Sequence, residues 1–184
     1  MTISLSRLDP VGADRAALVD FLTSNEFPFH VVHRPGREQV EKLIDDGAYR
    51  DADHDTFWLD HDRLGRVGTL RLEDLTDDAP LVDVRLAEAY RGRGLGAEVL
   101  RAAADHVFTT MPAVLRLEGQ TREDNVAMRR TFLRCGWVKE AHYRDGWPVE
   151  GGEPVASVAY AILRRDWASG TTTTFEWEDL SLDD

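Results

Sequence analysis

Apolar and polar residues alternate along seven short stretches of the chain, and a period of two is typical of half-buried β-strands. These stretches predict strands at residues 2–8, 56–60, 65–75, 81–87, 113–118, 137–143 and 155–163. The second and third strands are joined by a short segment that ends at Gly65, so they predict an antiparallel hairpin.

Apolar residues recur at helical spacing in other stretches, which predict helices at residues 13–24, 37–46, 95–110 and 123–134. The last helix is followed by Gly136, a residue type that commonly ends helices. The order of strand 81–87, helix 95–110 and strand 113–118 predicts one βαβ unit. We therefore expect a mixed α/β fold.

The length and composition indicate one domain. The chain has 184 residues, of which 42% are hydrophobic, and this suits a single domain with its own core. We expect the domain to span residues 1–168. Residues 169–184 begin with a run of threonines and end with acidic residues, so we expect a solvated acidic tail, with an added strand at 171–177 as the alternative.

Charge and cysteine content exclude several classes of protein. The formal net charge is -12, which argues against nucleic acid as a partner, because such binding depends on Lys and Arg, and is compatible with a cationic substrate. The single cysteine, Cys135, excludes an internal disulfide and a multi-cysteine metal site. No stretch approaches the ~18 apolar residues of a membrane span. The N-terminal sequence lacks a signal-peptide pattern, so we expect a cytoplasmic protein.

A glycine-rich turn, Arg91-Gly-Arg-Gly-Leu-Gly96, lies between a predicted strand and a predicted helix. Unpaired N–H groups at a helix start attract anions, and glycines let the main chain approach a phosphate closely. We therefore expect this turn to bind a phosphate group. It does not continue into the Gly-Lys-Ser or Gly-Lys-Thr of a Walker-type loop.

The turn also fits a loose dinucleotide fingerprint, formed by Gly92, Gly94 and Ala97 with Glu118 further on. This leaves a nicotinamide-dependent oxidoreductase as an alternative. A dinucleotide domain usually starts with this turn, whereas here an antiparallel hairpin precedes it and only one further helix follows.

The same residues resemble the GNAT superfamily of N-acetyltransferases. Its acyl-CoA signature is matched by Arg91, Gly94 and Gly96, and its later asparagine, aromatic and glycine segment is matched by Asn125, Phe132 and Gly136-Trp137. The ending from Tyr160 to Trp167 is similar to the branch that acetylates protein N-termini, such as ribosomal-protein alanine or serine acetyltransferases, and related small amines. The resemblance is strong from about residue 81 to 167.

The resemblance implies a mostly antiparallel sheet of about seven strands and four helices, splayed between strands 81–87 and 113–118. It implies acetyl-CoA as cosubstrate, no metal, and a homodimer as a family-based expectation. The pantetheine arm would lie in the splay and the pyrophosphate on the glycine turn. The implied cofactor-binding residues are Val84, Leu86, Arg91, Gly92, Arg93, Gly94, Leu95, Gly96, Asn125 and Phe132.

Direct acetyl transfer to an amine in a ternary complex needs a base for the ammonium and stabilisation of the leaving thiolate. The base candidates are Glu118, at the expected end of its strand, and Asp83, which shares a strand face with Arg85. Many members of the family carry a tyrosine where this chain has Phe132, which cannot donate a proton. Tyr143 or Tyr160, a water, or no acid would then serve, and Cys135 is expected to be a packed thiol.

The acceptor is expected to contact residues 27–30, the hairpin around Trp58 and residues 143–153. Aromatic and acidic side chains there suit a cationic amine, so a small amine and a peptide N-terminus are both compatible. The histidines match no strong metal motif, and we expect His30 and His33 to be solvated loop residues. A CoA-binding regulatory module with little catalysis is the second alternative, because of Phe132.

Overall fold

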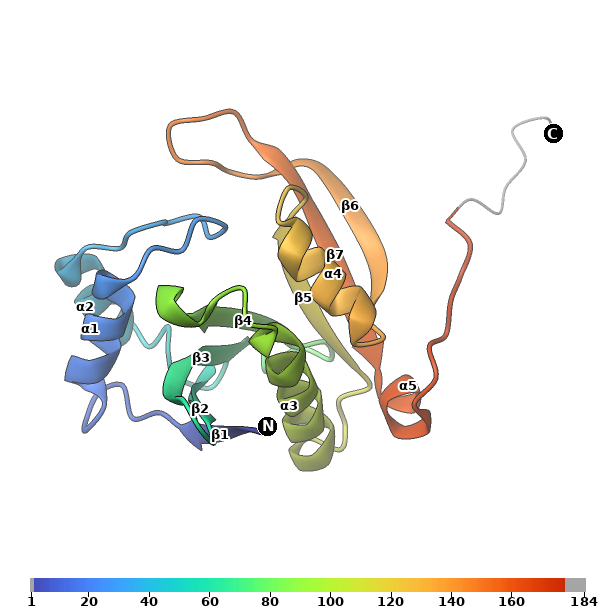
Figure 1. Ribbon diagram of the computed structural model, residues 1–184, viewed down its shortest axis with the longest axis horizontal. Helices are drawn as coiled ribbons and strands as arrows, with labels where there is room; N and C mark the ends of the chain where they lie inside the picture. The colour runs from blue at the N-terminus through green and yellow to red at the C-terminus, as the bar shows by residue number, and fades with distance from the viewer. Residues whose placement is uncertain (1, 178–184) are drawn as a thin grey trace.

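The computed structural model describes residues 2–177, which form one seven-stranded sheet with helices on both faces (Figure 1). The elements are β1 (Ile3–Arg7), α1 (Arg15–Ser24), α2 (Arg37–Asp45), β2 (Asp55–His61), β3 (Gly65–Glu73), β4 (Leu81–Leu86), η1 (Glu88–Tyr90), α3 (Leu95–Thr110), β5 (Arg116–Arg122), α4 (Val126–Arg134), β6 (Val138–Trp147), β7 (Val155–Leu163) and α5 (Arg164–Ser169). The strand order is β1-β2-β3-β4-β5-β7-β6. Each neighbouring pair is antiparallel except β4 and β5. The predicted mixed, mostly antiparallel fold is confirmed.

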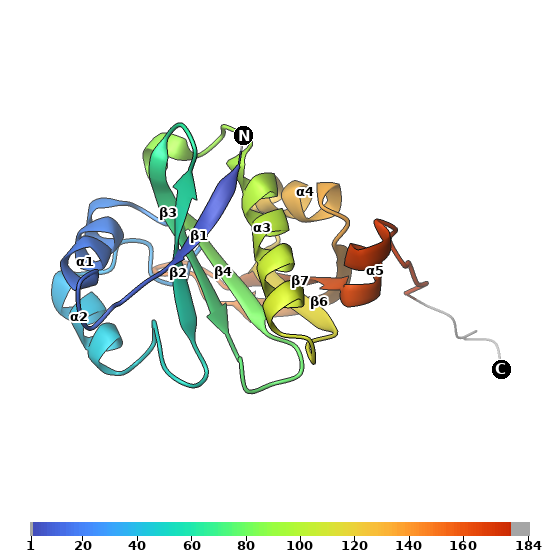
Figure 2. The ribbon, with the colours of Figure 1, turned by 90° about the horizontal axis from the view of Figure 1, so that it is seen from below.

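Helices α1 and α2 cover one face of the sheet and helices α3 and α4 the other (Figure 2), and the two faces bury different sets of apolar residues. The larger core lies between the sheet and helices α3 and α4, where Leu70 and Leu72 of β3 pack with Val99 of α3. The smaller core lies under α1 and α2 and includes Leu18 and Trp58. The side-chain alternation along β3 leaves Arg71 on the face opposite Leu70 and Leu72, because successive side chains of a strand point to opposite faces.

Several boundaries differ from the sequence-based expectation. Helix α4 begins at Val126 rather than residue 123, because the Asn125 side chain accepts a hydrogen bond from the Met128 N–H (3.2 Å) and caps it. Strand β5 begins later and runs on to Arg122. Helix α5 was not predicted. Among residues 2–177, no helix has both the length and the apolar character needed to cross a bilayer.

The C-terminal segment does not add a strand to the sheet between residues 171 and 177. Thr173 instead binds the side chain of Asp166, with its N–H at 3.0 Å and its hydroxyl at 2.7 Å from the two carboxylate oxygens. These contacts hold the start of the segment against α5. The predicted acidic tail otherwise falls partly on residues 178–184, outside the described residues.

Strands β4 and β5 pair at one end only. Leu81 is the one residue of β4 in register with β5, opposite Glu118, and the Glu118 N–H donates to the Pro80 carbonyl at 2.9 Å. Beyond that point the edge of β4 that faces β5 has no strand partner among the described residues. The predicted splay between these strands is therefore present, and it opens toward their C-terminal ends.

Candidate active site

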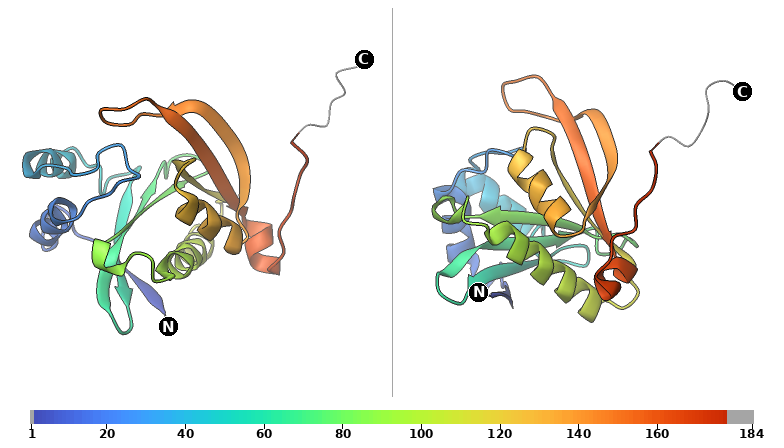
Figure 3. Two further views of the ribbon diagram at one scale, coloured as in Figure 1. Left: turned by 45° about the horizontal axis from the view of Figure 1, so that its top comes forward. Right: turned by 45° about the vertical axis from the view of Figure 1, so that its right-hand side comes forward.

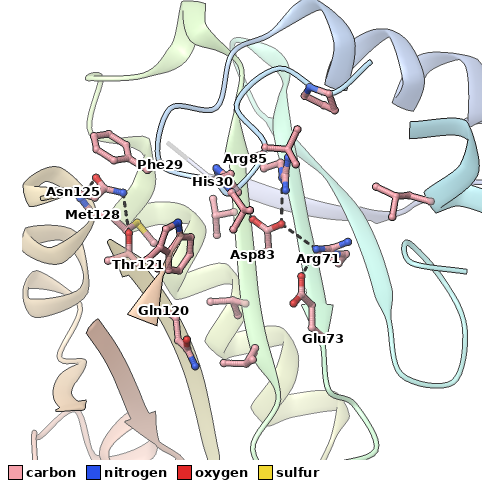
Figure 4. A pocket seen from close by; sticks show the side chains of 18 of the residues that line it. Phe29, His30, Arg71, Glu73, Asp83, Arg85, Gln120, Thr121, Asn125 and Met128 are labelled. Atoms are coloured by element: carbon pink, nitrogen blue, oxygen red, sulfur yellow. Dashed lines mark hydrogen bonds and ion pairs between the residues drawn. The ribbon is translucent and has the colours of Figure 1, made fainter. Parts of the chain in front are cut away.

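A cavity of about 450 Å³ lies where β4 and β5 separate (Figure 4). Its walls come from the α1–α2 loop, α2, β3, β4, β5, the start of α4 and the end of β6. Figure 4 shows His30, Asp83 and Arg85 together on one side, with Thr121, Asn125 and Met128 across from them. The lining residues are Phe29, His30, Val31, Val32, Pro35, Gln39, Leu43, Tyr49, Arg71, Glu73, Leu81, Val82, Asp83, Val84, Arg85, Gln120, Thr121, Asn125, Met128 and Trp147.

The glycine turn has the geometry of an anion-binding loop. Gly92 and Gly94 have φ angles of 72° and 83°, and a Cβ at either position would meet no atom within 4 Å. Helix α3 begins directly afterwards at Leu95, so its first N–H groups lack helical acceptors and its positive dipole end faces the turn. The turn therefore fits a phosphate group, and the space over both glycines stays open to it.

The two arginines of the turn have different environments. Arg91 donates to the Leu86 carbonyl (2.9 Å) and to the Glu26 carbonyl, and its guanidinium lies 5.4 Å from the ring centroid of Phe27. Burial lowers the pKa of Arg91 from its ordinary value. Arg93 is exposed and lies over Tyr90. The exposed side chain of Arg93 is therefore available to a phosphate, whereas two of the three nitrogens of the Arg91 guanidinium bind the end of β4 and the α1–α2 loop.

The cofactor-binding residues predicted on the strands and on α4 are partly brought together. Val84 and Asn125 line the cavity, while Leu86 packs against the larger core. The Asn125 side chain caps α4 and donates to the Thr121 hydroxyl at 2.9 Å. The open edge of β4 at Val84 is suited to pairing with an amide-containing arm such as pantetheine.

Asp83 is the centre of an ion-pair cluster in the cavity wall. Its Oδ1 lies 2.8 Å from Nε2 of His30, and its Oδ2 accepts from Arg71 (3.3 Å) and from Nε of Arg85 (3.2 Å). Burial alone would raise the pKa of Asp83, but Arg85, His30 and Arg71 together hold the pKa well below its ordinary value. A carboxylate with so low a pKa is a weak proton acceptor, so these contacts argue against Asp83 itself as the base.

His30 is the residue that sequence reasoning missed. It was expected to be a solvated loop residue, but its side chain is 25% exposed and its Nδ1 atom is buried without a hydrogen-bond partner among residues 2–177. The loop that carries it is fixed by the His33 carbonyl, which accepts from the Phe27 N–H at 2.7 Å, and by Arg122, which donates to the Pro28 carbonyl at 3.2 Å. The aromatic and proline content of residues 27–29 was the one local signal that this loop is structured.

Other predicted site residues lie away from the cavity. Glu118 is not at a strand end, because β5 continues to Arg122; it lies where β4 and β5 meet and is ion-paired with Arg116 at 2.6 Å. Tyr143 is 53% exposed on β6 and does not line the cavity. Trp58, expected near the acceptor, is buried in the smaller core and donates to Asp14 at 3.0 Å. From the segment 143–153, Trp147 alone lines the cavity.

The position where the family carries a tyrosine is part of the larger core. Phe132 is 1% exposed and stacks on Tyr160 with ring centroids 4.9 Å apart and an interplanar angle of 11°. The Tyr160 hydroxyl accepts from Nε of Arg129 at 3.2 Å. Neither ring lines the cavity. Phe132 therefore supports the strands beneath the splay and does not itself reach the cavity.

The remaining reactive side chains form no second centre in the described part of the chain. Burial raises the pKa of the Cys135 thiol, and its sulfur lies 3.6 Å from the Ala97 carbonyl oxygen, as expected for a packed thiol. Among residues 2–177, no group of three or more His, Cys, Asp or Glu side chains is arranged to hold a metal ion.

Comparison with known proteins identifies the class to which this fold and site belong. Residues 6–138 match the family model described as the acetyltransferase (GNAT) domain, which covers more than half of the chain. The chain therefore belongs to the GNAT acetyltransferase family. It is an acetyl-CoA-dependent N-acetyltransferase, and the predicted family and donor are confirmed.

Solved structures agree on the fold. A chimera of spermidine N-acetyltransferase from Vibrio cholerae and hSSAT is 15% identical, with a TM-score of 0.74, and the match covers 91% of this chain and 99% of that chain. Spermidine N-acetyltransferase from Vibrio cholerae in complex with CoA and spermine is also 15% identical, with a TM-score of 0.73 and coverage of 91% and 98%. No curated protein sequence matches. A mostly antiparallel sheet with one parallel pair also rules out the doubly wound sheet of the oxidoreductase alternative.

Proposed function

We propose that the protein acetylates the primary amine of a small molecule, with His30 as the general base and Asp83 as its positioning residue. The single observation that carries this proposal is the environment of His30. Its Nε2 is held by Asp83, while its buried Nδ1 has no partner among the described residues and belongs to a side chain of the cavity wall. A neutral imidazole that donates from Nε2 has a lone pair on Nδ1, where it can accept a proton.

The proposed chemistry follows the logic of an oriented base. Asp83 Oδ1 accepts the Nε2–H and fixes the ring and its tautomer. Because Nδ1 has almost no exposed surface in the structure, acceptor binding has to open the space beside this atom; the amine then gives up a proton to Nδ1, and its nitrogen becomes a nucleophile. Acetyl-CoA would supply the acetyl group: as the new N–C bond forms, the thioester C–S bond would break, and the second amine proton would pass to the leaving CoA thiolate to give free CoA. The cluster around Asp83 keeps its carboxylate ionised, so it stabilises the imidazolium that forms.

The cofactor site is proposed on the glycine turn and the β4 edge. The N–H groups from Gly92 to Gly96 and the side chain of Arg93 would hold the pyrophosphate. The open edge of β4 at Val84 would pair with the pantetheine arm, and Asn125 would contact it from α4. These residues supply positioning, and the turn contributes the positive end of a helix dipole.

Small-molecule amines are favoured as acceptors because the cavity measures only about 450 Å³. It is lined by the α1–α2 loop and, at Trp147, by the end of β6, and the α1–α2 loop and the β6–β7 hairpin lie at the same end of the sheet (Figure 1, Figure 3). The solved structures named above include one with spermine bound, which supports a small amine. A peptide N-terminus, a homodimer and a cytoplasmic location stay predictions from the sequence.

The test compares His30→Gln with His54→Gln. His54 is a matched control, because it also binds an aspartate, Asp51, at 2.9 Å, but lies outside the cavity. We expect His30→Gln to lower kcat with a responsive amine by about 10²- to 10⁴-fold, as is usual for loss of a general base. It should also remove the fall in rate at low pH that imidazole protonation causes. CoA affinity should be unchanged in both variants.

Two outcomes would overturn parts of the proposal. An unchanged rate and pH profile in His30→Gln would exclude His30, and Glu118→Gln would then be the next variant to measure. Binding of CoA without turnover on any member of a broad amine panel would favour the regulatory-module alternative over an enzyme.

A further inference from the structure

The charges lining the cavity are balanced. Two lining carboxylates, Glu73 and Asp83, face two lining guanidinium groups, Arg71 and Arg85. The whole chain carries a net charge of -12, but the acceptor side of the cavity is not acidic. A charged acceptor can bind to whichever of these four groups still has hydrogen-bond donors or acceptors that are not already paired.

The carboxylates are already engaged. Asp83 receives hydrogen bonds from His30, Arg71 and Arg85, and Glu73 is ion-paired with Arg71. A second ammonium group on an acceptor would have to displace an arginine from one of these carboxylates. Since a buried ion pair that loses one partner is costly, this exchange is unfavourable.

Arg85 has free donors. Its Nε donates to Asp83, but neither terminal nitrogen makes a hydrogen bond within residues 2–177. The side chain is 17% exposed, and its guanidinium carbon lies 5.0 Å from the ring centroid of Phe27, so the group is held in place. A planar guanidinium with two free N–H₂ groups matches a carboxylate in a bidentate geometry.

A second donor in the cavity wall is also unpaired. Nε1 of Trp147 is buried and has no hydrogen-bond partner among the described residues. An indole N–H can only donate, and a buried donor without a partner costs about 1–3 kcal/mol. A ligand could pair with this donor only after the Trp147 side chain moves, so the inference rests on Arg85.

We propose that the acceptor of this enzyme is a primary amine that also carries a carboxylate, an amino-acid-like molecule, with the carboxylate bound by Arg85. The inference rests on the proposed function, because it places the amine of the same molecule next to His30. His30 and Arg85 bind the two oxygens of one carboxylate, that of Asp83, so they lie side by side (Figure 4). One small molecule with neighbouring amine and carboxylate groups can reach both.

The first experiment needs no variant. The wild-type enzyme is assayed with acetyl-CoA on glycine, β-alanine, alanine, phenylalanine and lysine, on the carboxamide of each, and on spermidine. We expect kcat/KM for the responsive amino acid to exceed that of its carboxamide by about 10- to 150-fold, the value of one hydrogen bond to a charged group. Faster acetylation of the carboxamides or of spermidine would overturn the inference while leaving the proposed function intact.

Variants then test whether Arg85 is the residue that causes this preference. Arg85→Gln should abolish the preference for the acid over its carboxamide. The readout is the ratio of the two kcat/KM values, because the loss of the contact to Asp83 lowers both rates together. Arg85→Lys should restore part of the preference, because a lysine keeps the charge but loses the bidentate fork. Arg66→Gln is the matched control, since Arg66 is an exposed arginine of β3 outside the cavity. A preference that survives Arg85→Gln would refute the assignment to Arg85, and no turnover on any amine would refute the proposed function itself.

Discussion

Gly94 offers a sharp test of the anion-binding turn, because its conformation and its surroundings predict two separable effects. It caps α3 with φ 83° and ψ -1°, and a Cβ there would meet no protein atom within 4 Å. In Gly94→Ala the strain of a left-handed backbone costs about 1–2 kcal/mol of stability. For a domain of this size that corresponds to a fall in Tm of roughly 2–8 °C.

The second effect concerns the ligand. The added Cβ would occupy the space over the helix start where the pyrophosphate is proposed to lie. Loss of one hydrogen bond to a charged group costs about 1.5–3 kcal/mol, which is about a 10- to 150-fold weaker Kd for CoA. We expect Gly94→Ala to fold, to melt slightly lower and to bind CoA at least tenfold more weakly.

Gly151→Ala separates strain from obstruction. Gly151 lies in the β6–β7 connection with φ 69° and also has no atom within 4 Å of its Cβ position, so it carries the same backbone penalty far from the turn. Calorimetry with CoA and thermal unfolding with and without CoA would be measured on both variants. Equal CoA affinities in the two variants would refute the location of the pyrophosphate on this turn.

Two further predictions concern the walls of the cavity. The pKa of Asp83 is held below its unfolded value, so its ionisation stabilises the fold above about pH 4 and this contribution is lost as the pH falls through the folded value. The free energy of unfolding of Asp83→Asn, measured with urea, should therefore be about 3–5 kcal/mol lower than that of wild type at pH 7, and it should fall less when the pH is lowered. A pH dependence equal to that of wild type would contradict this. In Gly119→Ala the new Cβ would lie 2.6 Å from Cζ of Phe132 and 3.2 Å from Cγ2 of Val82. We expect about 1–3 kcal/mol of destabilisation from overpacking, partly relieved in Gly119→Ala combined with Phe132→Leu, and additive losses would show that this contact is not the cause.

Local patterns in the sequence predicted much of the fold. Helix α3 and strand β7 have the predicted bounds, 95–110 and 155–163. Helix α3 buries a periodic apolar face in the larger core, and β7 is a run of residues buried at every position except its two ends. Strand β5 was displaced, since its second half contains Gly119, Gln120 and Thr121, which lack the apolar alternation on which strand prediction depends. Gln120 and Thr121 line the cavity, and Gly119 leaves room for the ring of Phe132.

The functional site shows the same difference between features that local sequence predicts and features that depend on the fold. The glycine turn was predictable because an anion site at a helix start is encoded within six consecutive residues. The pairing of His30 with Asp83 was not, because 53 residues separate them in the chain and an irregular loop brings them together. Its anchor, the contact from Arg122 to Pro28, spans 94 residues. The sequence therefore indicated the donor side of the reaction, while the acceptor side required the fold.

The side chain of Arg91 connects the acceptor side, the loop that carries His30, with the donor side, the glycine turn. The family signature implied that Arg91 would flank the phosphate, and that stays a prediction. In the structure its guanidinium also binds the Glu26 carbonyl, and the Glu26 N–H in turn donates to Glu88 at 2.5 Å. The loop that carries His30 is thus fastened to η1 and to the residue that begins the glycine turn. The Arg91 side chain is half-buried and its two hydrogen bonds join the Leu86 and Glu26 carbonyls. The proposed base is therefore held at a fixed position relative to the cofactor turn by the same signature arginine that, from the sequence alone, was expected to bind only the cofactor.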